Sequence, residues 1–147
     1  MKIGIGEIDY APPVGLSLMG NLRKDYASKG VHDPLCAKAM VLEDSSGSKA
    51  AIMTVDICML SREQIAGMRE TIAGQSDIPA DRILIAATHT HSGPATMQKY
   101  VSPNVDKDKI RAFLAKAAQA VVSADRDLRN GMLCVGRSRE ERVSFCR

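Results

Sequence analysis

The sequence contains no tryptophan, and aromatic residues make up only 3% of it. Proteins that bind single-stranded nucleic acid stack bases on aromatic side chains, so this composition argues against nucleic acid as a partner. No apolar run approaches the roughly 18 residues of a membrane-spanning helix, so no transmembrane segment is expected. The four cysteines are widely spaced and form no C-x-x-C pair, and we expect them to be free thiols.

The sequence also lacks a recognisable leader. Met1 leads directly into a strand-like segment, without the basic and apolar regions of a signal peptide. As written, the chain is expected to be cytoplasmic and reduced. A secreted or periplasmic parent protein stays open, because signal peptides are often removed. The net charge is only +3, and acidic residues alternate with the C-terminal arginines, which predicts a mixed-charge surface rather than a phosphate-binding patch.

The apolar patterning predicts several short strands. A length of 147 residues suits one domain with enough chain to bury a core. The turn Asp44-Ser45-Ser46-Gly47 predicts a hairpin between the apolar runs on either side of it. The run at 83–88 is long enough for a buried strand and too short for a helix, so an aspartate at Leu84 or Ile85 should unfold the chain. The expected strands are residues 2–8, 35–42, 50–55, 83–88 and 131–135, with a further one beginning at 143–146.

Two helices are expected between these strands. Ser61 and Gln64 fit a capping box, and Gly74 is expected just past the end of that helix. A second helix is predicted over residues 106–124. The apolar residues on the expected buried faces are Ile65, Met68 and Ile72 in the first helix, and Ile110, Phe113, Leu114, Ala117 and Val121 in the second.

Strands interleaved with helices predict an α/β fold, a layered sheet with helices packed on it. Residues 50–55 and 83–88 enclose one helix, which is the pattern of a right-handed βαβ crossover. Residues 11–34 show no sustained period and are expected to form a long ordered loop, and such loops tend to be functional. Residues 1–147 are expected to be a single domain or an incomplete N-terminal part of a larger one.

The strand over residues 83–88 runs directly into His89 and His91, where ligands of open α/β sheets usually bind. Two imidazoles can serve one pocket if the backbone bends, and Gly93 and Pro94 favour a bend. A catalytic zinc typically needs three protein ligands, so two histidines are insufficient. The alternative is a pair of loop histidines hydrogen-bonded to the backbone.

Other polar residues have competing interpretations. His32 is the remaining histidine, and the adjacent Asp33 either orients its imidazole or caps a turn. Asp9 and Asp56 end two of the predicted strands, where functional carboxylates occur but turn or helix caps are more common.

Several segments match one known family in order. These are Gly4-Ile5-Gly6-Glu7-Ile8-Asp9, then Pro12-Pro13-Val14-Gly15 and Leu18-Met19-Gly20, then Gly30-Val31-His32-Asp33-Pro34-Leu35, and finally a buried strand running into His89-Thr90-His91-Ser92-Gly93-Pro94. The sequence thereby resembles the N-terminal portion of the catalytic domain of neutral/alkaline ceramidases, over nearly its whole length. The last segment is the most specific.

This resemblance implies a zinc-dependent amide hydrolase that cleaves ceramide into sphingosine and a fatty acid. It implies that His89 is a ligand of one zinc ion and that His91 acts catalytically in the same pocket. We assign His32 to substrate binding. The expected partner is a lipid or small amide substrate.

The chain also departs from the family. The family's second zinc histidine, its glutamate and its tyrosine come from much further along a longer chain and are not assigned here. We therefore expect an exposed apolar surface where a missing C-terminal segment or an oligomer partner docks. Two alternatives stay open: a non-catalytic binding or structural module, or another His-x-His metal hydrolase.

Overall fold

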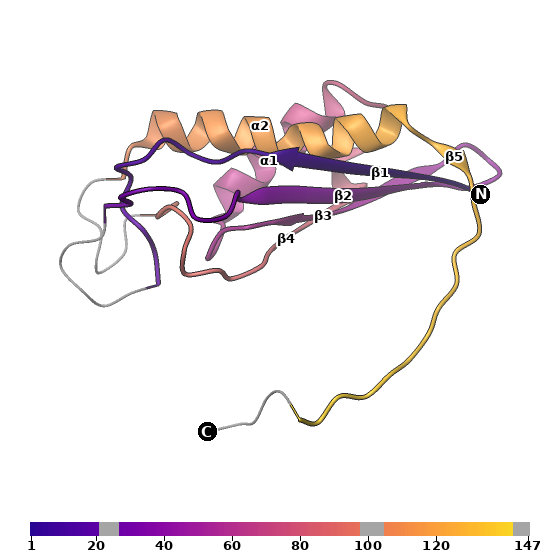
Figure 1. Ribbon diagram of the computed structural model, residues 1–147. Coiled ribbons are helices and arrows are strands. Elements are labelled where there is room, and N and C mark those ends of the chain that lie inside the picture. Colours follow the sequence, from indigo (N-terminus) through magenta and orange to yellow (C-terminus); the bar gives the residue numbers. More distant parts are fainter. Residues whose placement is uncertain (21–26, 98–104, 143–147) are drawn as a thin grey trace.

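The computed structural model describes residues 1–20, 27–97 and 105–142. These residues fold around one mixed five-stranded sheet (Figure 1). The strand order is β4-β3-β2-β1-β5, and helices pack on the sheet, so the expected α/β fold class is confirmed. The elements are β1 (Lys2–Asp9), β2 (Cys36–Glu43), β3 (Lys49–Val55), α1 (Arg62–Ala73), the 3-10 helix η1 (Ala80–Arg82), β4 (Ile83–Ala87), α2 (Lys107–Arg126) and β5 (Arg129–Asn130).

The predicted βαβ unit is present. Strands β3 and β4 are parallel, with Met53 opposite Ile85, and α1 lies between them in the chain. The predicted hairpin is also confirmed, because β2 and β3 pair antiparallel. Since β3 and β4 run in the same direction, the segments that follow Val55 and Ala87 leave the sheet at the same edge.

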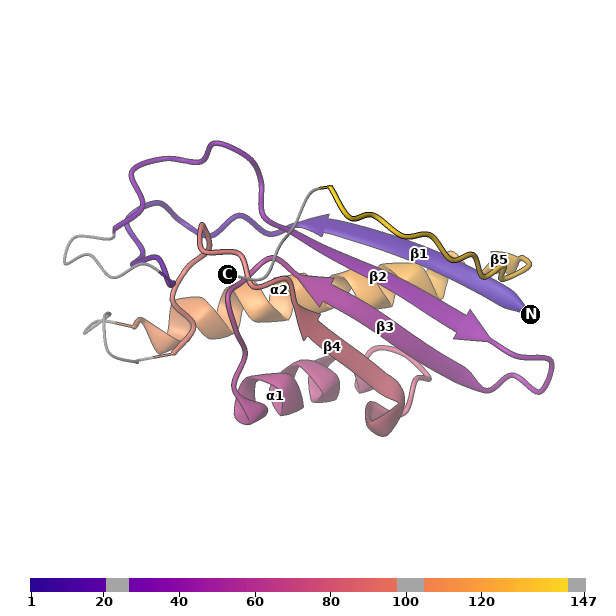
Figure 2. The ribbon, with the colours of Figure 1, turned by 90° about the horizontal axis from the view of Figure 1, so that it is seen from below.

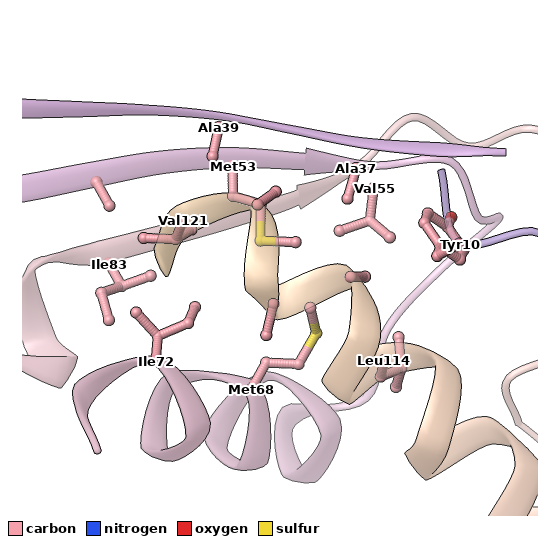
Figure 3. Packing of buried hydrophobic residues seen from close by; sticks show 14 of the residues in the cluster. Tyr10, Ala37, Ala39, Met53, Val55, Met68, Ile72, Ile83, Leu114 and Val121 are labelled. Atoms are coloured by element: carbon pink, nitrogen blue, oxygen red, sulfur yellow. The ribbon is translucent and has the colours of Figure 1, made fainter. Parts of the chain in front are cut away.

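Both helices lie on one face of the sheet (Figures 1 and 2). The capping box of α1 is present: Ser61 accepts from the backbone N–H of Gln64, whose side chain accepts from the backbone N–H of Ser61. The core between helices and sheet joins Met68 and Ile72 of α1 to Met53 and Val121, as Figure 3 shows. The predicted buried face of α2 is confirmed, since all five expected residues are buried: Ile110, Phe113, Leu114, Ala117 and Val121.

The two glycines of β1 let α2 approach the sheet closely. A Cβ at Gly4 would lie 1.9 Å from the carbonyl oxygen of Ala124, and one at Gly6 would lie 2.0 Å from that of Ala120. No side chain fits at either position. The glycines that weaken a strand by propensity are therefore required here by packing.

No helix of the described residues covers the opposite face of the sheet (Figure 2). Ile5, Met40, Ile52 and Leu84 are register neighbours across four strands and form one row. Ile5, Ile52 and Leu84 are 62%, 45% and 56% exposed. The expectation that Leu84 is buried was wrong, because β4 is covered on its helix face only. We call this row the open-face row.

The strand expected over residues 131–135 is not formed. After α2, only Arg129 and Asn130 (β5) pair with β1 among the described residues, and the chain then leaves the sheet. Met132, Leu133 and Val135 are 82%, 50% and 93% exposed, so the apolar residues that suggested a strand stay largely accessible to solvent. The strand expected from 143–146 lies outside the described residues.

Two isolated bridges involve the long loop after β1. The first joins Ser17 to Ala27 within the loop, and the second joins Leu18 to Pro94. The second of these brings the loop onto the His89-containing segment. Among the described residues, no helix is long and apolar enough to cross a membrane.

Candidate metal centre

The candidate centre lies where the chain leaves β3 and β4. The backbone N–H of Thr88 donates to Val55, and that of His89 donates to Ile57, both at 3.0 Å. These bonds carry the parallel pairing past the end of β4. They hold residues 89–96, which we call the histidine segment, against the loop that leads from β3 to α1.

His89 is held by this loop through its side chain as well. Its Nδ1 lies 2.8 Å from the carbonyl oxygen of Cys58. A carbonyl oxygen only accepts hydrogen bonds, so Nδ1 donates here, and in the neutral imidazole Nε2 then carries the lone pair. Metal-binding histidines are commonly oriented in this way: one ring nitrogen donates to an acceptor, and the other nitrogen binds the metal.

The bend that brings the two histidines together occurs at His89, not at Gly93. His89 has a φ of 64°, in the left-handed region that residues other than glycine seldom adopt. The rings of His89 and His91 lie 5.1 Å apart between centroids, at 63° to each other. Gly93 instead allows close packing, because a Cβ there would lie 3.1 Å from the carbonyl oxygen of Asp56.

Cys58 joins the two histidines, and sequence reasoning missed it. One potential ligand atom from each of Cys58, His89 and His91 lies within 4.8 Å of the others. Imidazole nitrogen and thiolate sulfur are donors that suit zinc. The Cys58 thiol is buried, whereas both histidines are exposed. The three residues thus form a group with the donor types and spacing of a possible metal site, although 31 residues separate Cys58 from His89 and no spacing motif reveals it.

His32 lies elsewhere. Its side chain is 97% exposed, and its Nδ1 lies 2.8 Å from Oδ2 of Asp33. It lines a cleft of about 770 Å³ that also touches Thr90 and Ser92 of the histidine segment. The structure therefore brings His89 and His91 together and places His32 on a cleft beside them. The apolar side chains of that cleft include Val14, Leu16, Leu18, Val31 and Leu35.

The two strand-end aspartates cap backbone groups, as their alternative interpretation held. Asp9 accepts from the backbone N–H of Ala11 at 2.9 Å. Asp56 accepts from that of Cys36 at 3.0 Å, and its own carbonyl accepts from the buried Tyr10 hydroxyl. These bonds fix the ends of β1, β2 and β3 relative to one another.

Thr96 anchors the far end of the histidine segment. It is 3% exposed, and its hydroxyl donates to the carbonyl of Met59 at 2.6 Å. The side-chain amide of Gln64 donates to the Thr96 carbonyl, also at 2.6 Å. Gln64 thus serves both the capping box of α1 and the segment that carries the histidines.

Comparison with known proteins places this arrangement in one family. Residues 1–147 match the family model described as neutral/alkaline non-lysosomal ceramidase, N-terminal. Neutral ceramidase A of Dictyostelium discoideum is 33% identical over 103 residues, which is 67% of this chain and 14% of that protein. Neutral ceramidase 2 of Arabidopsis thaliana is 25% identical over 143 residues, which is 92% of this chain and 19% of that protein.

A solved structure shares the fold. The crystal structure of neutral ceramidase from Pseudomonas aeruginosa superposes with a TM-score of 0.71 at 21% identity, covering 87% of this chain and 22% of that one. The chain thus spans less than a quarter of the length of these relatives. Because the family model matches from residue 1 to residue 147, the chain belongs to the neutral/alkaline non-lysosomal ceramidase family.

Proposed function

We propose that this chain supplies the His89 and His91 portion of a zinc centre that hydrolyses the amide bond of ceramide. The observation that carries the proposal is the hydrogen bond from His89 Nδ1 to the Cys58 carbonyl. It leaves the Nε2 lone pair of a neutral imidazole available, which is the form of histidine that binds zinc.

Each histidine has a distinct task in this proposal. A bound zinc ion would polarise the amide carbonyl and lower the pKa of its water to about 7. His89 holds the ion through Nε2. His91, with its ring 5.1 Å from that of His89, contacts the reacting oxygen or the substrate. His32 binds substrate from the wall of the adjoining cleft, whose apolar side chains suit an acyl chain.

The remaining zinc ligands come from polypeptide outside the described residues of this chain. Only Cys58, His89 and His91 form a group with metal-ligand geometry among the described residues, and a catalytic zinc also needs an open position. The curated relatives are more than four times longer than the part matched here. We propose that further polypeptide, or a second copy of the chain, covers the open-face row and completes the centre.

Zinc binding by the purified chain tests this proposal. We expect a zinc titration against a chromophoric chelator to show binding that weakens at least about tenfold in His89→Ala. His32→Ala is the matched control, because it removes an imidazole outside the cluster, and its affinity should equal that of the unsubstituted chain. Equal affinity in His89→Ala would reject His89 as a ligand.

The second candidate is a non-catalytic module that keeps the fold without the chemistry. The incomplete ligand group favours it for the chain by itself. Absence of zinc binding by the chain, both alone and mixed with the remainder of a longer relative, would select this alternative. Membership of the ceramidase family supports a ceramidase-type centre over another His-x-His hydrolase.

A further inference from the structure

The ring of His91 packs against Gly20, a residue of the long loop after β1. A Cβ at Gly20 would lie 2.2 Å from Cγ of His91, 2.4 Å from its Cδ2 and 2.7 Å from its Nδ1. Real Cβ atoms do not approach other atoms so closely. We infer that Gly20 is a positioning residue for His91, because its missing side chain leaves the space that the imidazole occupies.

The contact between Gly20 and His91 is built by backbone pairing on the same two segments. The N–H of Ala95 donates to the carbonyl of Ser17 at 2.7 Å. The N–H of Met19 donates to the carbonyl of Gly93 at 3.1 Å. These bonds bracket the Leu18–Pro94 bridge, so the loop after β1 lies along the histidine segment and delivers Gly20 to the ring.

Gly20 satisfies two requirements at once. Its φ of +98° belongs to the left-handed region, which turns the chain at the end of the paired stretch. Its lack of a Cβ admits the ring. His91 is then bounded by Gly20 on one side and by the His89 ring at 5.1 Å. A ring confined in this way is oriented before a ligand arrives, which lowers the entropy lost on binding.

The consequence for chemistry rests on the proposed function, since it assumes that His91 works in the metal pocket. The contact itself is a property of the chain without metal, so it can be tested separately. Gly15 provides the matched control. Its φ is +100°, and a Cβ there would meet nothing within 4 Å. Alanine at Gly15 therefore brings the backbone strain of Gly20→Ala without the contact.

A double-mutant cycle measures the contact. We expect Gly20→Ala to raise the unfolding equilibrium constant about tenfold more than Gly15→Ala does, because overpacking adds to the shared strain. In the His91→Ala background that excess should disappear. If Gly20→Ala fails to fold, recovery of folding in the Gly20→Ala/His91→Ala double variant gives the same answer.

Nuclear Overhauser spectroscopy of the metal-free chain supplies a readout that general destabilisation does not move. The α protons of Gly20 should show cross-peaks to the ring proton on Cδ2 of His91, and these should persist in Gly15→Ala. Missing cross-peaks, strictly additive effects in the cycle, or a double variant no more stable than Gly20→Ala would each overturn the assignment. Failure to bind zinc would count against the proposed function and leave this result unchanged.

Discussion

The Nδ1 atom of His89 lies 2.8 Å from the carbonyl oxygen of Cys58, and this contact joins the ends of two parallel strands. The Cys58 sulfur lies further away, 3.7 Å from the same nitrogen. The backbone oxygen, rather than the thiol, therefore orients the ring. Any residue at position 58 carries that carbonyl, so the histidine is oriented independently of the side chain there.

Cys58→Ser should therefore change zinc affinity by less than about threefold, whereas loss of a true ligand costs tenfold or more. The serine keeps the carbonyl that orients His89 and nearly the volume of the buried thiol. Cobalt(II) in place of zinc provides the spectroscopic check, because a thiolate ligand produces an intense near-ultraviolet charge-transfer band.

We expect that band to be weak or absent in the unsubstituted chain. Its presence there, together with its loss in Cys58→Ser, would make the thiol a ligand and require His89 to release the carbonyl. His89→Ala should remove cobalt binding in either case and serves as the negative control.

The close packing of α2 against the glycines of β1 leads to a second prediction. Gly6→Ala should lower the free energy of unfolding by about 2–3 kcal/mol or prevent folding, because its Cβ would lie 2.0 Å from the Ala120 carbonyl oxygen. Urea denaturation followed by circular dichroism measures this change.

Gly67→Ala is the control for the same substitution in an open setting. Gly67 lies within α1, and a Cβ there would meet nothing within 4 Å. Alanine should stabilise the helix by about 1 kcal/mol. Equal effects at the two glycines would mean that α2 does not pack against β1 as described.

Local patterns in the sequence predicted most of the fold, because the elements are encoded by neighbours in the chain. The capping box at Ser61 and the helical spacing of Met68 and Ile72 need no distant partner to be recognised. Where a strand ends, by contrast, depends on whether a partner strand lies beside it. Residues 131–135 have a strand-like composition, yet pairing with β1 ends at Asn130.

The centre was only partly predictable for the same reason. His89 and His91 stand in one short segment that resembles a known motif. Cys58 and Gly20 meet them only after folding. Gly20 stands in a segment that matches the family, but neither that segment nor the residues around Cys58 show that they contact the histidines. The bend was predicted from Gly93, since glycine is the usual residue at positive φ, but hydrogen bonds to Ile57 and Cys58 hold His89 itself in that conformation.

A lysine at two neighbouring positions of β3 should have very different effects on the stability of the fold. Ile52 is 45% exposed in the open-face row, and Met53 is fully buried against the helices. Ile52→Lys should change stability by less than about 1 kcal/mol and reduce binding of an apolar fluorescent dye. Met53→Lys should unfold the chain, because it buries an unpaired ammonium group.

Analytical ultracentrifugation of the same variants tests whether the row mediates self-association. If a second copy covers the open face, Ile52→Lys should shift the chain toward the monomer. Unchanged dye binding and unchanged mass in Ile52→Lys would show that the row is not the exposed apolar surface of the chain.

Alkaline pH should destabilise the fold through two groups whose pKa values are raised. The nearby Asp125 carboxylate, 2.8 Å away, raises the pKa of Lys49 above its ordinary value of 10.5. Burial, reinforced by the charge of Asp56, raises the pKa of Tyr10 above its ordinary 10.0. The folded state then holds protons that the unfolded state releases. The stability they contribute is complete below about pH 10 and falls as pH rises from there toward the folded-state values.

Urea denaturation at intervals from pH 8 to pH 11 measures this slope. We expect the free energy of unfolding to fall above pH 10, and to fall less steeply in Lys49→Met, whose side chain has no proton to lose. Lys109→Met is the matched control, because Lys109 pairs with Asp106 on an exposed surface, with 56% of its side chain accessible. A surface pair of that kind contributes little to stability, so its removal should leave the slope unchanged. A Lys49→Met profile that coincides with that of Lys109→Met would show that the Lys49–Asp125 pair does not couple folding to pH.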